Sequence, residues 1–280
     1  MIIIIPGADF STKNIGQVQV PIQWDVDALA YRTAIPAAAA TFDYAKNKAL
    51  NTFFKALKSN GIWSKIDSLY LPLFGYQEGS KNLKDPNSDN LGLPAPGAIA
   101  SYSNKGVLFA GIFVKAGTVL AAKFNDSHFG FYNTTAGETT DTAQRVGIGI
   151  GPPAGSGFFV GRRTSTGANT CGFVLSSEYR AIIPNHDKSI GAMIGCANAS
   201  LKLVGVQSGA EYRQFIGTEA QAFPSPTSPR SIIIGSYRAD TLQAPLNTSI
   251  GLITLGAYLN EAEVGLYSTL QATLMNALTA

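Results

Sequence analysis

Charged residues are scarce in this sequence. Asp, Glu, Lys and Arg make up 14% of its 280 residues, against roughly 25% in an average soluble domain. We expect a surface so poor in charge to be partly covered by neighbouring copies of the chain; a large, dry sandwich core is the alternative explanation. The net charge of +3 is small, and no run of Lys and Arg is dense enough to predict a nucleic-acid-binding patch.

Cysteines and long apolar runs are also rare. Cys171 and Cys196 lie in stretches with strand character, and we expect buried free thiols because no metal-ligand spacing is present. The apolar runs fall short of the roughly 18 residues that a membrane-spanning helix needs. The start MIIIIPGADF has no basic residue before its isoleucines and is interrupted by Pro6, so we predict no signal peptide and synthesis in a cytoplasm.

The first 40 residues lack the apolar content for a core of their own. Residues 2–5 and 18–22 have strand character, and residues 34–40 are expected to form a linker or the lead-in to a helix. An open edge of four isoleucines is an aggregation hazard. We therefore predict that this arm, residues 1–40, is buried against another subunit as an attachment or oligomerisation segment; burial against the main domain is the alternative.

A helical segment is predicted over residues 41–75. Residues 41–59 have the spacing of an amphipathic helix, with Thr41 as the expected N-cap. Its expected apolar face consists of Ala45, Ala49, Leu50, Phe53, Phe54 and Leu57. A second, short helical stretch is predicted over residues 62–70, closed by Pro72.

Short apolar runs alternate with turns from Val107 onward. Strands are expected at residues 107–114, 119–124, 128–133, 145–151, 157–162, 170–176, 190–197, 201–207, 231–237 and 250–259. No helical pattern separates them, which favours antiparallel sheets over βαβ units. The predicted fold class is mainly β: an antiparallel β-sandwich of jelly-roll type over residues 76–280.

The C-terminal stretch has the clearest pattern. An apolar strand ends at Gly256, and Asn260 and Glu263 then match a capping box at the start of a helix over residues 260–278. An apolar stripe follows at spacings of three and four, made of Val264, Tyr267, Leu270, Leu274 and Leu278. This pattern predicts a helix that docks on the sandwich at an end or flank.

Several of these stretches resemble phage and prophage tail or head fibre proteins. They are ALKSNGIWSKIDSLYLPLFG (residues 56–75), NLKDP (82–86), NDSHFGFYN (125–133) and the run from IIIGSY to LYSTLQATL (232–274), and the opening IIIPGADFSTKNIGQV (3–18) is similar to N-terminal segments of phage structural proteins. The pattern is similar to the concanavalin A-like lectin/glucanase (laminin G-like) sandwich of virion proteins. Residues 134–231 match it only in the rhythm of their strands.

The resemblance implies a virion protein made in the cytoplasm of a host bacterium. It would be a fibre, decoration or receptor-binding subunit that forms a homotrimer, joins other virion proteins and contacts carbohydrate on the host surface. It implies neither nucleic-acid binding nor membrane insertion. A stand-alone lectin module and a glycan-cleaving enzyme are the alternative functions.

No motif in the sequence predicts catalysis or a cofactor. Asp85, Asn87 and Asp89 have the initial spacing of a calcium loop, but the glycine and the final glutamate of that loop are missing. A glycosidase needs two spaced carboxylates, and the E-x-D-x-E-type strand of sandwich glucanases is absent. The glycines at 147–157 precede no GK[ST] sequence. We therefore predict that the chain has no metal, no cofactor and no enzymatic activity.

Candidate ligand-binding residues come from one predicted strand and the residues before it. Asn125, Asp126, His128 and Tyr132 combine amide, carboxylate, imidazole and aromatic groups, which suit a sugar at a sheet edge. A structural role for His128 is the alternative. His186, the only other histidine, is expected at a loop tip, and Tyr102, Tyr179, Tyr212 and Tyr237 are further aromatic candidates.

Overall fold

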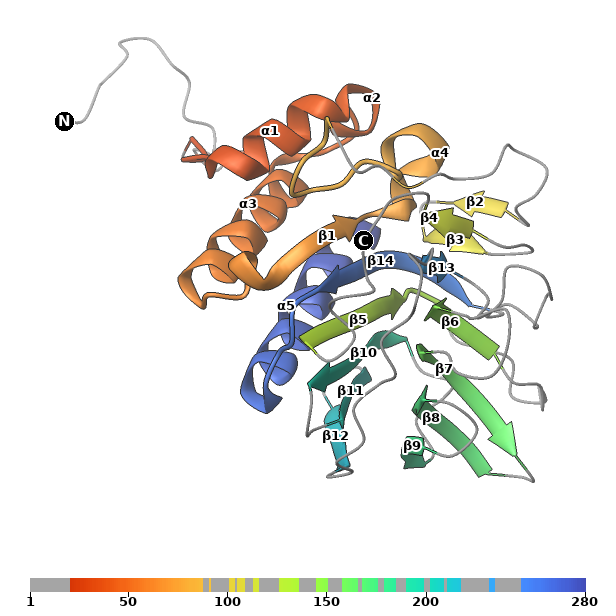
Figure 1. Cartoon of the computed structure of the whole chain (residues 1–280). Helices are drawn as coiled ribbons and strands as arrows, with labels where there is room; N and C mark the ends of the chain where they lie inside the picture. The colour runs from red at the N-terminus through yellow and green to blue at the C-terminus, as the bar shows by residue number, and fades with distance from the viewer. Residues whose placement is uncertain are drawn as a thin grey trace, which may run out of the picture.

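The computed structural model defines two antiparallel sheets and a set of helices (Figure 1). The residues that it describes are 21–87, 91, 101–103, 105–108, 113–115, 126–135, 145–150, 158–165, 168–175, 179–184, 190–198, 202–208, 211–217, 232–234 and 248–280. Residues 1–20 of the predicted arm and the expected strand at 119–124 therefore lie outside the described residues.

The larger sheet has eight strands. Its order is β12-β11-β10-β5-β14-β3-β2, with β1 also paired to β14. The strands are β1 (Ile66–Tyr70), β2 (Ser101–Ser103), β3 (Gly106–Leu108), β5 (Asp126–Asn133), β10 (Gly191–Asn198), β11 (Lys202–Ser208), β12 (Glu211–Gly217) and β14 (Ser249–Gly256). β5 and β14 lie at the centre, although more than a hundred residues separate them in sequence.

The smaller sheet has six strands, in the order β4-β13-β6-β7-β8-β9. These are β4 (Phe113–Lys115), β6 (Arg145–Ile150), β7 (Phe158–Ser165), β8 (Ala168–Leu175), β9 (Tyr179–Pro184) and β13 (Ile232–Ile234). Contacts of β7, β8 and β9 with β10, β11 and β12 join the two sheets. The predicted mainly antiparallel β fold is confirmed, and its arrangement is consistent with a β-sandwich.

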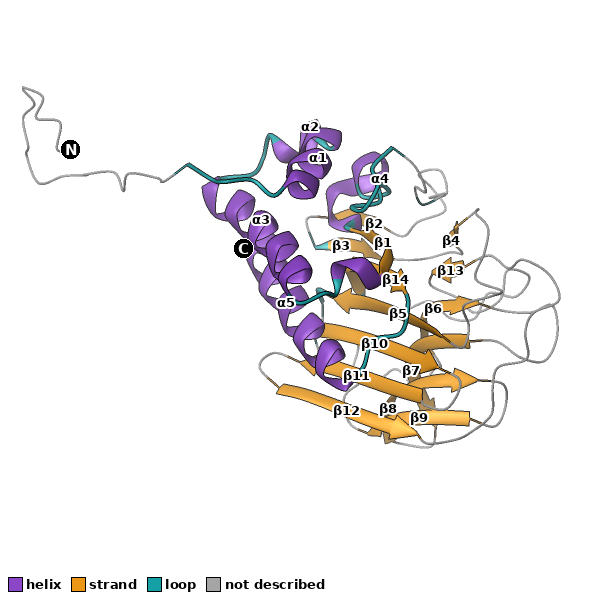
Figure 2. Ribbon diagram, turned by 60° about the vertical axis from the view of Figure 1, so that its left-hand side comes forward, coloured by secondary structure: helices purple, strands orange, loops and turns teal. Residues whose placement is uncertain are grey.

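The helices are α1 (Val26–Ala34), α2 (Pro36–Ala39), α3 (Tyr44–Ser59), α4 (Gly75–Glu78) and α5 (Glu261–Thr279), with short 3-10 turns η1 (Trp63–Lys65) and η2 (Pro72–Phe74). α5 packs on β10, β11, β12 and β14, α3 packs on α5, and α1 packs on α3. Figure 2 shows these helices on one side of the molecule, over the outer face of the larger sheet. The final helix thus covers a broad sheet face, where the sequence suggested an end or flank. None of the helices in the described ranges is both long and apolar enough to cross a membrane.

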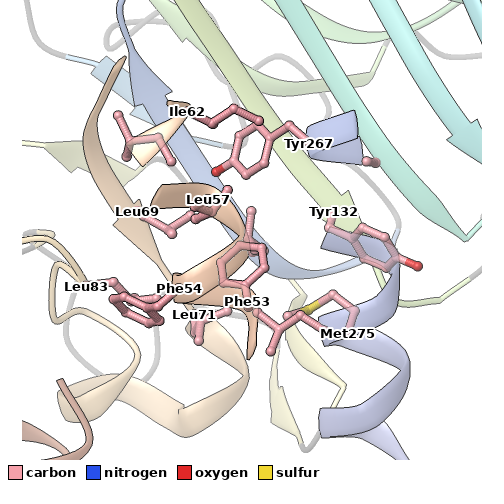
Figure 3. Packing of buried hydrophobic residues seen from close by; sticks show 14 of the residues in the cluster. Phe53, Phe54, Leu57, Ile62, Leu69, Leu71, Leu83, Tyr132, Tyr267 and Met275 are labelled. Carbon is pink, nitrogen blue, oxygen red and sulfur yellow. The ribbon is translucent and has the colours of Figure 1, made fainter. Parts of the chain in front are cut away.

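The larger sheet is buried on both faces, as the alternation along β5 shows. Phe129 and Phe131 lie opposite Leu255 and Ile253 of β14 and point away from the helices. Tyr132 is on the opposite face of the strand and belongs to the cluster beneath the helices. That cluster joins Phe53, Phe54 and Leu57 of α3 with Tyr267 and Met275 of α5 (Figure 3). Each such side chain contributes about 1.5–3 kcal/mol on burial.

The predicted start of α5 is confirmed. The Asn260 side chain accepts from the Glu263 backbone N–H at 3.0 Å, and the Glu263 carboxylate accepts from the Asn260 N–H at 2.9 Å. Lys65 then holds the same carboxylate with two contacts of 2.7 Å. The capping box therefore also ties α5 to the chain segment that leads into β1.

Two local predictions in the helical segment were wrong. The N-cap of α3 is Asp43, whose carboxylate accepts from the Lys46 N–H at 2.8 Å, and not Thr41. Residues 66–70, predicted as helix, form strand β1, because they pair with β14. Their apolar residues suit either conformation, and the sheet decides between them.

The described part of the predicted arm contains helices. Residues 26–34 and 36–39 form α1 and α2, which precede α3 on the helical side of the molecule. The Asp25 carboxylate caps α1 by accepting from Asp27 N–H and Ala28 N–H. Whether the arm joins subunits remains a prediction.

Candidate functional site

The structure describes three of the four candidate ligand residues, and it separates the exposed Asp126 from the buried His128 and Tyr132. Asn125 lies outside the described residues, and Asp126 is exposed at the start of β5, where its carboxylate accepts from the Tyr258 N–H at 3.1 Å. His128 and Tyr132 are 0% and 3% exposed, beneath the helical layer. A sugar in solution cannot contact these two side chains, because β5 is a central strand and its outer face is covered by helices.

His128 links β5 to β14 and the lead-in to α5. Its Nδ1 lies 2.6 Å from the Ala257 carbonyl oxygen and its Nε2 lies 3.1 Å from Thr254 Oγ1. The Tyr267 hydroxyl donates to the same Thr254 oxygen at 2.9 Å. A neutral imidazole with its proton on Nδ1 satisfies all three hydrogen bonds. Nδ1 then donates to the Ala257 carbonyl, and Thr254 donates to Nε2.

Burial keeps this histidine neutral. Desolvation lowers the pKa of His128 to about 4, although its bond to the Ala257 carbonyl opposes the shift. The Tyr267 ring meets the imidazole edge-on, with 6.2 Å between ring centres. These surroundings support a structural role, the alternative that the sequence left open.

Carboxylates on the helical side are occupied by structural contacts. Glu78 accepts from the N–H groups of Ala37 and Ala38 at 2.9 and 2.6 Å and so caps α2. Glu261 accepts from the Gln214 amide at 3.0 Å, and Glu263 belongs to the capping box. Such contacts hold helix ends in place and do not poise a carboxylate for proton transfer to a substrate.

The residues weighed for metal binding have other surroundings. The Asp85 carboxylate accepts from the Asn87 N–H at 3.1 Å, as in a structural turn, while Asp89 lies outside the described residues. Cys196 is buried in β10 without a disulfide, and burial raises the pKa of its thiol. Within the described ranges, no group of three or more His, Cys, Asp or Glu residues could hold a metal ion.

Asn51 is a positioning residue that the sequence analysis missed. It lies outside the predicted apolar face of its helix, yet it is only 6% exposed. Its Oδ1 accepts from the Asp25 N–H at 2.7 Å and its Nδ2 donates to the Gln23 carbonyl at 3.0 Å. Lys58 lies 2.7 Å from the Asp25 carboxylate, and this pairing lowers the pKa of Asp25 although partial burial opposes it. The chain is thereby fixed to α3 just before α1 begins.

The six-stranded sheet is the candidate surface for a ligand. Helices cover the outer face of the larger sheet, whereas the smaller sheet lies on the opposite side of the molecule from them (Figure 2). In the part of the chain that the structure describes, no helix is drawn over that sheet's outer face. Sheet faces and their connecting loops are surfaces on which sugars can stack and find polar partners.

Comparisons of the sequence with protein-family models and with curated proteins find no match. The structure is similar to several solved structures. The CBM40 of Ruminococcus gnavus IT-sialidase bound to alpha2,3 sialyllactose is 13% identical with a TM-score of 0.36, over 51% of this chain and 83% of that one. A Trypanosoma rangeli sialidase mutant is 10% identical with a TM-score of 0.49, over 80% of this chain and 39% of that one.

A phage protein is among the similar structures as well. The enzymatically active domain of bacteriophage CBA120 tailspike protein 2 is 9% identical with a TM-score of 0.39, over 55% of this chain and 25% of that one. The chain thus spans well under half the length of the tailspike and sialidase chains. At these identities, the likeness concerns a β-rich fold alone.

The prediction that the chain is not an enzyme is corrected by these findings. Structures similar to it include a sialidase, an arabinofuranosidase and an enzymatically active tailspike domain, beside carbohydrate-binding modules. The prediction relied on the absence of recognisable catalytic motifs, among them the carboxylate strand of sandwich glucanases. The absence of a known motif from the sequence does not exclude activity.

Proposed function

We propose that this protein is a glycan-binding subunit of a phage particle, of the tail or head fibre type. The proposal includes a concanavalin A-like sandwich that engages host surface carbohydrate through the six-stranded sheet and its loops. It also includes self-association, as a trimer, and attachment to other virion proteins through the N-terminal arm.

The division of the molecule into two sides carries the proposal. Helices α3 and α5 seal one sheet, and their interface with it is filled by large apolar side chains such as Phe53 and Tyr267, whose stacked rings lie 6.5 Å apart. A ligand could reach the sheet face beneath these helices only by displacing the packed side chains. The opposite sheet lies away from this layer, so it is the side on which we place recognition.

The sequence supports the assignment to a phage particle. The stretches at residues 56–75, 82–86, 125–133 and 232–274 are the ones that resemble phage fibre proteins. The scarcity of charge, 14% of residues, suits a chain whose surface is shared with neighbouring subunits. Sialyllactose, the ligand bound in one similar structure, is the natural first probe.

A glycan array on the full chain tests the ligand. We expect binding of at least one bacterial or sialylated glycan in the micromolar to millimolar range, abolished when that free glycan is added. The same incubations are assayed for released reducing ends, which detects hydrolysis of a bound glycan. No binding and no hydrolysis across bacterial surface polysaccharides and sialyllactose would contradict the proposal.

A further inference from the structure

The outward side of α1 carries an unusual apolar face. Val26 is 73% exposed, the largest value among the exposed large hydrophobic residues of the described chain, and Leu29 is 43% exposed. They are three positions apart and therefore neighbours on the helix surface. Ala30 and Thr33 continue the exposed strip. We call Val26, Leu29, Ala30 and Thr33 the α1 face.

The inner side of the same helix is also apolar. Ala28, Tyr31 and the following Ile35 are each 0% exposed against the helical cluster. Apolar residues on both sides of a helix are typical of a helix that is covered on both sides. Among the described residues, only the inner side of α1 is covered.

Charge is absent from the α1 face because the charged residues of this stretch are turned inward. Residues 21–40, all described, contain Asp25, Asp27 and Arg32 as their charged residues. Lys58 pairs with Asp25 at 2.7 Å and with Asp27 at 2.6 Å, and Arg32 donates to Asn47 at 2.8 Å. A partner for the α1 face therefore needs apolar surface and no complementary charge.

The outward orientation is fixed. Asn51 holds the chain before α1 through two hydrogen bonds, and Glu78 caps α2, which follows it. The helix cannot rotate to bury Val26 and Leu29 without the loss of these contacts. The exposure of the α1 face is thus a property of the folded chain.

We infer that the α1 face is the docking site for the N-terminal segment, residues 2–5, of a second copy of this chain. Residues 2–5 are four isoleucines without charge, the chemistry that the α1 face requires. Residues 2–5 lie 16 to 19 positions before Pro21, where the described chain leads into α1, and an extended segment of that length spans about 60 Å. Such a reach is long enough for the isoleucines of one copy to extend beyond their own chain to the α1 face of a neighbour. The inference rests on the self-association in the proposed function.

The mass of the protein in solution tests whether the α1 face holds the oligomer together. Val26→Asp combined with Leu29→Gln is expected to convert the oligomer to a single chain of 29.5 kDa, as deletion of residues 1–20 should. Both positions are exposed, and Asp suits the first turn of a helix, so the melting temperature should stay close to that of the wild type. Leu266→Gln is the matched control, because Leu266 is 37% exposed on α5 and its replacement should leave the oligomer intact.

Cross-linking identifies the occupant. Ile4→Cys is placed in one tagged copy and Leu29→Cys in a differently tagged copy, and the two are mixed under oxidising conditions. A covalent product that carries both tags supports the inference. A cross-link that forms only when both cysteines are in one chain would overturn it, since the arm would then cover its own helix, and so would the absence of any cross-link.

The outcomes separate this inference from the proposed function. A wild-type chain that is monomeric contradicts the proposed self-association itself. An oligomer that survives Val26→Asp with Leu29→Gln contradicts only the role of the α1 face.

Discussion

The buried histidine gives the sharpest prediction about stability. Burial lowers the folded-state pKa of His128 to about 4, from the ordinary histidine value of 6.5. Above pH 6.5 the imidazole is neutral in both states, and the stability of the fold is at its full value. As the pH falls from 6.5 to 4, the unfolded chain binds a proton that the folded chain does not, so the folded state loses stability across this window.

The magnitude follows from the two pKa values. A difference of about 2.5 pKa units, at 1.36 kcal/mol per unit, corresponds to about 3 kcal/mol. His128→Asn removes this proton uptake while its amide can still donate to the Ala257 carbonyl. At pH 7 the variant should be less stable by about 1–3 kcal/mol, because Thr254 loses its acceptor and the ring leaves a void.

Urea unfolding of the wild type and His128→Asn at pH 7, 5.5 and 4 measures both effects. The stability gap between the two proteins should shrink as the pH falls, and the variant should lack most of the loss between pH 6.5 and 4. His186→Asn is the control for the other histidine, and it should keep the wild-type pH dependence. Parallel curves for the wild type and His128→Asn would refute the buried neutral imidazole.

Three further substitutions test local structure. Asn260→Ala should cost about 1 kcal/mol in urea unfolding by removing the cap of α5; no loss would contradict the capping box. Asn51→Ala should cost about 1–3 kcal/mol and speed proteolysis ahead of α1, because it leaves the Asp25 N–H unpaired; unchanged proteolysis would argue against that anchor. Gly256→Ala should lower the free energy of unfolding by about 1–3 kcal/mol or more, since its Cβ would lie 2.0 Å from the Lys65 carbonyl oxygen. An unchanged melting temperature would contradict this close contact between the backbones at Gly256 and Lys65.

Local sequence predicted the elements whose structure depends on nearby residues. The capping box of Asn260 and Glu263 and the apolar stripe of α5 are set within a few turns of helix, and both are confirmed. The same holds for the apolar face of α3, of which Phe53, Phe54 and Leu57 are buried. Strand β1 could not be predicted in this way, because its conformation depends on β14, nearly two hundred residues later.

Predicting the candidate site required the order of the strands and the contacts between residues that are distant in sequence. A sugar-binding role for His128 requires a sheet edge, but β5 lies between β10 and β14 and beneath α5, and the structural role holds instead. Strand order is not encoded in the alternation of a single strand, which specifies two faces and not what covers them. Asn51 was missed for a related reason: a polar residue on a helix predicts exposure unless a distant backbone segment, here 23–25, binds it.

Hydrogen–deuterium exchange with a bound glycan is the most direct test of the central claim that recognition belongs to the side opposite the helices. Peptides from β6, β7, β8 and β9 should be protected when the glycan that scores best on the array is added, and peptides from β5 and α5 should be unchanged. Protection confined to α3, α5 and the strands beneath them would contradict the account.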